Sequence, residues 1–247
     1  MNNPQNNTKL PHYDSKNNNK SSLDIYLQSR KDLLYYDFIR SLLMTICRKE
    51  DSICDVGSRG VDMLSFLPCK IKKSIDLQYP YSDDETEGIK GDYLEHDLSG
   101  LDVITCFQVL EHVKDDKVEL FAHKLLDDAR IAIISVPYMW PEGLCKYHVQ
   151  DPVDVDKIIS WFGKNPVFLH TVKEKNHISR IIAVFVKDLP SPTVDLDFWR
   201  KNALKTSEDF AKYLAAKKKQ IMTDQLLSPE QFRQTILLVK IPAISFQ

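Results

Sequence analysis

The sequence has no apolar stretch that approaches the roughly 18 residues of a membrane-spanning helix, and the longest candidate, residues 131–140, is interrupted by Pro137. Its five cysteines are scattered without any Cys-x-x-Cys spacing, and an odd number argues against a disulfide framework. The formal net charge is only −2, so no excess of basic residues indicates nucleic acid as a partner. We therefore expect a soluble protein of a reducing cytoplasm that does not bind nucleic acid.

The chain does contain enough apolar residues, 43% of 247, for an ordinary buried core, and its composition divides it into three parts. Residues 1–22 are rich in Asn, Lys and Ser, lack the apolar segment of a secretory signal and are predicted to be a disordered tail. Residues 23–187 are predicted to form one domain. Residues 188–247 open with two prolines and are predicted to be a helical extension, with one helix at 194–220 and another from Pro229.

Short apolar runs alternate with segments of helical spacing in the central part, which is the pattern of parallel βαβ units. Apolar residues within residues 23–48 predict one or two further helices. Residues 173–177 are too few for a parallel crossover, so the strands that they join should be antiparallel. We predict an α/β protein with a Rossmann-like, mostly parallel sheet of seven strands, an antiparallel last strand and helices on both faces. The expected strands are residues 53–56, 71–77, 88–94, 101–107, 130–136, 167–172 and 178–186, and the expected helices between them are residues 61–67, 115–127 and 152–162, the last capped by Asp151.

One strand end carries the strongest functional signal. The run Ile53-Cys54-Asp55-Val56-Gly57-Ser58-Arg59-Gly60 is an apolar strand that stops at an acid and then turns through glycines. Asp76, at the end of the next predicted strand, follows Gly57 by 19 residues, the spacing at which a ribose-binding carboxylate is expected. This arrangement is typical of a cleft that binds a nucleotide-like cofactor.

These signals, with Leu110-Glu111-His112-Val113 after the fourth strand and the antiparallel end of the sheet, resemble class I S-adenosylmethionine-dependent methyltransferases over residues 52–187. A looser likeness, carried by Ser135-Val136-Pro137-Tyr138-Met139-Trp140-Pro141, Tyr147-His148 and Asp151-Pro152, is to bacterial small-molecule methyltransferases of surface-glycan (polysaccharide) biosynthesis. The resemblance implies S-adenosyl-L-methionine as the cofactor, S-adenosyl-L-homocysteine as a product, and a small molecule or glycan precursor as the acceptor.

The resemblance also implies roles for individual residues. Gly57 would let the backbone approach the methionine moiety, Asp55 would orient the ammonium group of that moiety, and Asp76 would accept hydrogen bonds from both ribose hydroxyls. Asp92 would receive the adenine amino group. Plainer alternatives are a helix cap for Asp55 and a solvated strand end for Asp76. The implied cofactor-binding set is Asp55, Gly57, Ser58, Arg59, Gly60, Asp76, Leu77, Asp92, Tyr93, Phe107 and Gln108.

The chain departs from the family pattern in its glycine turn. Arg59 and Val61 occupy the second and third glycine positions of Gly-x-Gly-x-Gly, leaving Gly60 to supply flexibility. The Arg59 guanidinium would contact the carboxylate of the cofactor, and the helix expected from Val61 would offer its N-terminus to the same group. The departure keeps open a non-catalytic, cofactor-binding partner subunit. A nicotinamide-dependent dehydrogenase is disfavoured, because Gly-x-Gly-x-x-Gly is missing and the final strand pair is antiparallel.

Methyl transfer from a sulfonium mainly requires positioning, but a hydroxyl acceptor must also lose its proton, and a neutral imidazole suits that step. The candidate bases are His148 and His112. His148 is preferred because it follows the fifth strand and Asp151 can fix its tautomer, although it could also only shape the pocket. Glu111 and His112 suggest a divalent metal site, but two adjacent residues do not converge on one ion without further ligands, so no metal is expected. No readable pattern identifies the acceptor, or says whether it is methylated on oxygen or nitrogen, or gives the oligomeric state.

Overall fold

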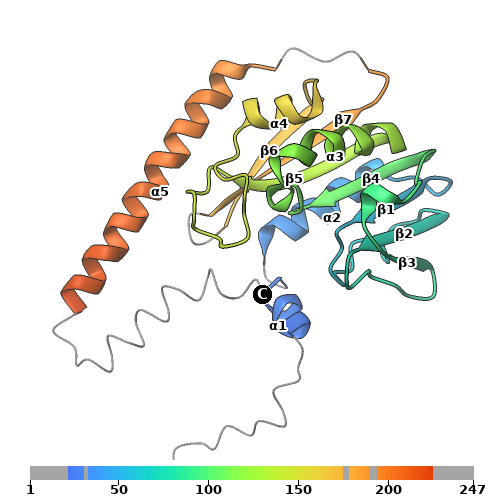
Figure 1. Cartoon of the computed structure of the whole chain (residues 1–247), viewed down its shortest axis with the longest axis horizontal. Coiled ribbons are helices and arrows are strands. Elements are labelled where there is room, and N and C mark those ends of the chain that lie inside the picture. The colour runs from blue at the N-terminus through green and yellow to red at the C-terminus, as the bar shows by residue number, and fades with distance from the viewer. Residues whose placement is uncertain (1–21, 31–32, 175–177, 190–193, 225–247) are drawn as a thin grey trace, which may run out of the picture.

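The computed structural model describes residues 22–30, 33–174, 178–189 and 194–224. Its centre is a seven-stranded sheet with the strand order β3-β2-β1-β4-β5-β7-β6 (Figure 1). The strands are β1 (Ser52–Val56), β2 (Ile71–Asp76), β3 (Thr86–Lys90), β4 (Leu101–Phe107), β5 (Ala129–Tyr138), β6 (Phe168–Lys173) and β7 (Ser179–Val186).

The strand directions confirm the predicted Rossmann-like α/β fold. Strands β1 to β5 are parallel to one another, whereas β7 runs antiparallel to both β5 and β6. The sheet order reverses between β1 and β4, because the chain leaves β1 toward β2 and β3 and then returns to β4 on the other side. In open sheets of this kind, ligands bind in the crevice beyond the carboxyl ends of the strands at such a reversal.

Helices cover both faces of the sheet. Figure 1 shows α3 and α4 on one face and α2 on the other, with the long α5 beyond α4. Short 3-10 turns, η1 and η2, follow β3 and β4. The bounds are α1 (Ser22–Arg30), α2 (Leu34–Ile46), η1 (Tyr93–Glu95), η2 (Leu110–His112), α3 (Asp115–Asp128), α4 (Val155–Phe162) and α5 (Leu196–Asp224).

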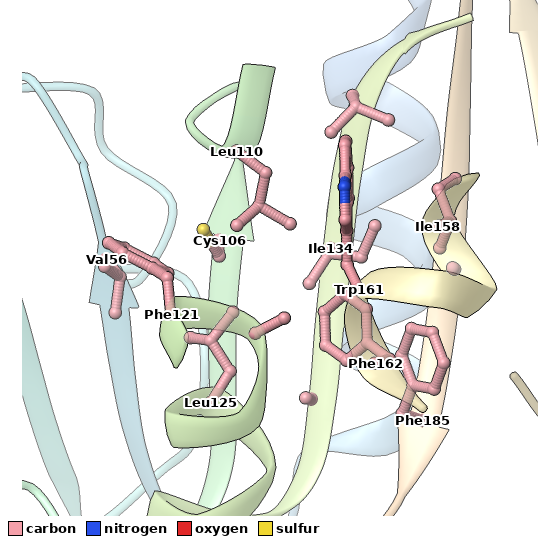
Figure 2. Packing of buried hydrophobic residues seen from close by; sticks show 14 of the residues in the cluster. Val56, Cys106, Leu110, Phe121, Leu125, Ile134, Ile158, Trp161, Phe162 and Phe185 are labelled. Carbon is pink, nitrogen blue, oxygen red and sulfur yellow. The ribbon is translucent and has the colours of Figure 1, made fainter. Parts of the chain in front are cut away.

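The larger part of the core lies between the sheet and the pair α3 and α4 (Figure 2). Phe121 and Leu125 from α3 and Trp161 and Phe162 from α4 point toward the strands there. The Phe162 ring stacks on Phe185 of β7 with the ring centroids 4.1 Å apart. The amphipathic spacing of both helices therefore reflects one shared apolar face.

A second core fills the opposite face of the sheet, under α2. Tyr35, Ile39 and Leu43 are fully buried there against Ile53 of β1 and Val103 of β4. Neighbouring residues of the same strands point into the first core, as the alternation of side chains along a strand requires. Because both faces are covered, the central strands read as continuous apolar runs in the sequence.

The helix predicted at residues 61–67 is wrong, since the segment after β1 forms turns instead. The Asp62 carboxylate accepts hydrogen bonds from the backbone N–H groups of Leu64, at 3.1 Å, and Ser65, at 2.9 Å. Such local bonds offer the backbone an alternative to the helix. Leu64 and Leu67 are still buried in the second core, which explains why the apolar spacing looked helical. A helix N-terminus beside the glycine turn is therefore absent.

The cap predicted for the helix after β5 is also wrong. Helix α4 begins at Val155, and the Asp154 side chain accepts from the backbone N–H of Lys157 at 2.8 Å. Asp151 lies upstream of this cap and contacts His148 instead. The strand predicted at residues 88–94 is shorter and earlier, since β3 ends at Lys90 and the chain then enters η1.

The predicted tail, apart from Ser22, and the predicted helix from Pro229 lie outside the described residues, so the domain boundaries stay predictions. Helix α5 lies within the predicted helical extension. Among the helices that the structure describes, none is both long enough and apolar enough to span a membrane. All five cysteines are buried free thiols.

Candidate active site

A cavity of about 830 Å³ opens at the carboxyl ends of the parallel strands, where the sheet order reverses. Its walls include residues that follow β1, β2, β3 and β4, residues of α1, and the segment between β5 and α4. The predicted site residues that line it are Gly57, Arg59, Asp76, Leu77, Asp92, Tyr93, Gln108, His112 and His148. Those that do not line it are Asp55, Ser58, Gly60, Phe107 and Asp151.

The glycine turn after β1 closely approaches the turn after β4. Gly57 has φ +77°, a conformation that side-chain-bearing residues rarely adopt, and its N–H donates to the carbonyl of Ile75 at 2.7 Å. A Cβ atom at Gly57 would overlap the side chain of Val109. Glycine is therefore required at this position both by the backbone conformation and by the close approach of Val109.

Asp76 joins the turn after β1 to the turn after β2. Its Oδ2 accepts from the backbone N–H of Arg59 at 3.1 Å, and its Oδ1 accepts from those of Gln78 and Tyr79, both at 2.8 Å. Two carboxylate oxygens offer about four acceptor positions, so these bonds leave roughly one for a ligand. The carboxylate thus shapes the cavity rim and also faces the cavity.

Asp55 is buried behind the cavity wall, and Thr105 Oγ1 donates to its carboxyl group at 2.6 Å. Burial raises the pKa of Asp55 to about 7, against the lowering effect of the Thr105 hydrogen bond, and the charges of Asp76 and Asp62 add to the increase. Ser58 is equally buried, and its hydroxyl accepts from the backbone N–H of Tyr81 at 2.9 Å. Both residues therefore lie behind the wall and make hydrogen bonds there, and neither faces the cavity.

The wall beyond β3 has an apolar and an acidic component. Asp92 accepts from the backbone N–H of Leu94 at 3.0 Å and lines the cavity beside Leu77 and Tyr93. The Tyr93 hydroxyl donates to Asp128 at 2.8 Å, and its ring packs tilted against Phe121, with the ring centroids 4.9 Å apart. This end of the cavity has the side chains that a flat heteroaromatic ring with an amino group would need.

Backbone strain gathers at the strand ends around the cavity. Arg59, Gln108 and Met139 have φ values of +45°, +58° and +56°, and they follow β1, β4 and β5. Holding a non-glycine residue in this conformation costs free energy, and such strained positions cluster at functional sites. Arg59 and Gln108 line the cavity, so two of these strained positions belong to its wall.

Arginines collect on the side of the cavity that α1 forms. The guanidinium carbons of Arg30 and Arg59 lie 4.4 and 4.5 Å from the centre of the Tyr26 ring. Buried Arg180 donates from Nε to Gln108 Oε1 at 3.1 Å, and its Nη1 lies 3.6 Å from the Glu174 carboxylate. All three arginines line the cavity, which gives this side a positive potential suited to an anionic group.

Sequence reasoning missed Tyr26, Arg30 and Arg180. A charged residue near the start of the apolar strand Ser179–Val186 was the one signal that could have identified Arg180. Tyr26 and Arg30 come from a helix whose place over the cavity is fixed only by tertiary packing.

The opposite side of the cavity holds Glu111, His112 and His148. Each offers one oxygen or nitrogen atom, and these three atoms lie within 4.8 Å of one another. His148 Nδ1 is 2.7 Å from a carboxylate oxygen of Asp151, and His112 Nδ1 is 2.9 Å from the carbonyl oxygen of Tyr147. The expected contact between His148 and Asp151 is therefore present.

The two histidines have opposite charge tendencies. Burial lowers the pKa of His112, so this ring is neutral at pH 7. Burial acts on His148 in the same direction, but hydrogen bonds to Asp151 and Cys145 and the charge of Glu111 outweigh it and raise its pKa to about 10. Burial also raises the pKa of Glu111 to about 7, opposed by the charge of His148.

Solved methyltransferases share the fold. The Burkholderia thailandensis 1,6-didemethyltoxoflavin-N1-methyltransferase, solved with bound 1,6-didemethyltoxoflavin and S-adenosylhomocysteine, aligns with a TM-score of 0.50 and 13% identity over 66% of this chain and 83% of its own. A putative RNA methyltransferase from Pyrococcus horikoshii aligns with a TM-score of 0.46 and 14% identity over 64% and 84%. The methyltransferase domain of a bacterial Hen1 protein gives a TM-score of 0.46 and 13% identity over 62% and 97%. No family model matches the sequence, and no curated protein is significantly similar to it.

Proposed function

We propose that this protein transfers a methyl group from S-adenosyl-L-methionine to a hydroxyl group of a small molecule, a sugar or glycan precursor. The observation that carries the proposal is Asp76, whose carboxylate faces the cavity while tying the Gly57 turn to the end of β2. A carboxylate beside a glycine turn at a sheet reversal is the arrangement that binds a nucleoside's ribose. The likeness of the fold to a methyltransferase solved with S-adenosylhomocysteine supports the same cofactor class.

The cavity wall suggests how the cofactor lies. One ribose hydroxyl would donate to the remaining acceptor position of Asp76, and the adenine ring would lie against Leu77 and Tyr93, with its amino group near Asp92. The anionic carboxylate of the methionine end would then lie toward Arg59 and the other arginines, which supply charge-assisted donors. In this arrangement the arginine side chains bind the carboxylate that a helix N-terminus would otherwise bind, since the segment between β1 and β2 forms turns and no helix.

The acceptor would enter beside the two histidines. Tyr147 is 41% exposed and lines the cavity, so its ring can stack on a sugar face. Between the two candidate bases, His112 is better suited to accept the hydroxyl proton, because its lowered pKa keeps it neutral. His148, with its pKa raised to about 10, is already protonated at pH 7 and would instead help to hold the developing anion. This order is the reverse of the one expected from loop position alone.

Calorimetric titration distinguishes this function from its rivals. We expect the purified protein to bind S-adenosylmethionine and S-adenosylhomocysteine and to show no heat with nicotinamide dinucleotides. Binding of a nicotinamide dinucleotide alone would indicate a dehydrogenase. Binding of the adenosyl ligands without formation of S-adenosylhomocysteine in the presence of a broad set of hydroxylated acceptors would favour a non-catalytic partner subunit.

A further inference from the structure

Three potential metal ligands converge on one side of the cavity. Glu111 and His112 come from the 3-10 turn η2 after β4, and His148 comes from the loop between β5 and α4. Their ligand atoms lie within 4.8 Å of one another. The adjacent pair Glu111 and His112 alone does not make a metal site, but the tertiary structure adds the third ligand that the sequence pattern lacks.

Hydrogen bonds orient both imidazole rings as in metal sites. The carbonyl oxygen of Tyr147 only accepts, so the Nδ1 of His112 must carry the proton that it donates. The same holds for Nδ1 of His148 against the Asp151 carboxylate. In the neutral rings, Nε2 is then the atom with a free lone pair. A carboxylate or carbonyl behind each imidazole is the usual arrangement around a bound cation, where it fixes the tautomer and strengthens the ligand.

The Glu111 carboxylate supplies an independent observation. This residue is only 1% exposed, lines the cavity, and has an oxygen, Oε2, without a hydrogen-bond partner among the described residues. Leaving a buried carboxylate oxygen unpaired is costly, so natural structures place a proton donor or a cation beside it. The side chains of matching chemistry nearby are the two imidazoles. His112 is neutral and offers a nitrogen lone pair, and His148 offers one when a bound cation displaces its proton, since metal ligands must be deprotonated.

We propose that Glu111, His112 and His148 bind one divalent transition-metal ion with open coordination positions toward the cavity. Two imidazoles and one carboxylate suit Mn²⁺, Fe²⁺, Co²⁺ or Zn²⁺ better than Mg²⁺ or Ca²⁺, which prefer all-oxygen sets. Ligand atoms about 2 Å from one ion lie about 3 Å apart, so the side chains close inward by roughly an ångström or two on binding.

The role of the ion rests on the proposed methyl transfer. An acceptor hydroxyl that coordinates an open position would release its proton to water in the cavity more readily, because the cation stabilises the alkoxide. The alkoxide oxygen would then bond to the methyl carbon as the methyl–sulfur bond breaks and S-adenosylhomocysteine leaves. His112 is then a ligand, and the metal replaces it as the group that activates the acceptor. Asp151 becomes a positioning residue, which acts on the ion only through His148.

Direct metal binding tests the inference without any substrate. Chelator-treated protein is titrated calorimetrically with Mn²⁺ and with Co²⁺, and the visible absorption of bound Co²⁺ reports its ligands. We expect binding of one equivalent, weakened at least tenfold in His148→Ala and in Glu111→Gln. Asp151→Asn should weaken it about tenfold, the usual effect of losing a group behind a ligand, and should alter the Co²⁺ spectrum.

The matched control is His123→Ala, which removes an exposed histidine of α3 and should leave the affinity unchanged. Thermal unfolding of each variant checks that it is folded, and His148→Gln replaces His148→Ala if the latter is not. No binding by the folded wild-type protein, or equal affinity in wild type, His148 and Glu111 variants, would overturn the inference. S-Adenosylhomocysteine titrated into chelated protein separates the two proposals: adenosyl binding without metal binding refutes only the metal site, and the reverse result refutes only the cofactor.

Discussion

Replacing Asp76 with alanine tests the structural and the functional role of this carboxylate together. The variant loses the acceptor for the backbone N–H groups of Arg59, Gln78 and Tyr79. Two of these donors are exposed and can turn to water, so we expect a loss of unfolding free energy of only about 1–3 kcal/mol. The ribose hydroxyl of the cofactor that donates to Asp76 loses its charged acceptor as well. That loss is worth another 1–3 kcal/mol or so, which is a roughly 5- to 150-fold weaker affinity for S-adenosylhomocysteine.

Asp83 provides a matched control for this experiment. Its Oδ1 also accepts from two backbone N–H groups, those of Glu85 at 2.9 Å and Thr86 at 2.7 Å, but Asp83 is not part of the cavity wall. Urea unfolding and calorimetric titration are measured on both alanine variants. We expect both to be less stable and only Asp76→Ala to lose cofactor affinity. An unchanged affinity in Asp76→Ala, or an equal loss in both variants, would refute the ribose assignment.

Three further predictions concern the sheet and its turns. Because the pKa of Asp55 is raised from 3.8 to about 7, folding takes up a proton between these pH values, and this group makes stability fall as the pH rises through that window. Asp55→Asn should therefore gain stability relative to wild type from about pH 4 to pH 7, by at most on the order of 4 kcal/mol. A stability difference in urea unfolding that does not change with pH would contradict this prediction. Gly57→Ala should abolish binding of S-adenosylhomocysteine in calorimetry and destabilise the protein, because the new methyl group overlaps Val109; wild-type affinity would show that the turn is not in contact with ligand. Phe185→Ala, which removes the ring stacked on Phe162, should cost about 3–5 kcal/mol in denaturant unfolding, and a loss under 1 kcal/mol would show that the two rings do not pack as described.

The strands were predictable because each needed only a short apolar run, and the direction of β7 followed from the short connection before it. The false helix at residues 61–67 shows the limit of such patterns. Leu64 and Leu67 are buried three residues apart, a spacing that occurs both in turns and in helices. The hydrogen bonds of the Asp62 carboxylate favour the turns, and the apolar spacing of the sequence contains no sign of them.

The site was predictable only where its residues stand at strand ends. Gly57, Asp76 and Gln108 line the cavity because the carboxyl ends of parallel strands meet at one edge of the sheet. Arg180 and the convergence of His148 with Glu111 depend on how separate segments fold against the sheet, which local patterns do not record. The sequence also could not predict the charge states of His112 and His148, because burial and hydrogen-bond partners in the folded protein set the pKa of each ring.

The most direct test of the account is a crystal structure of the protein grown with S-adenosylhomocysteine. We expect a ribose hydroxyl within hydrogen-bond distance of the Asp76 carboxylate, the amino-acid end beside Gly57 and Arg59, and the sulfur directed toward the His112 and His148 side of the cavity. A ligand bound elsewhere, or one whose ribose has no contact with Asp76, would contradict the central claim.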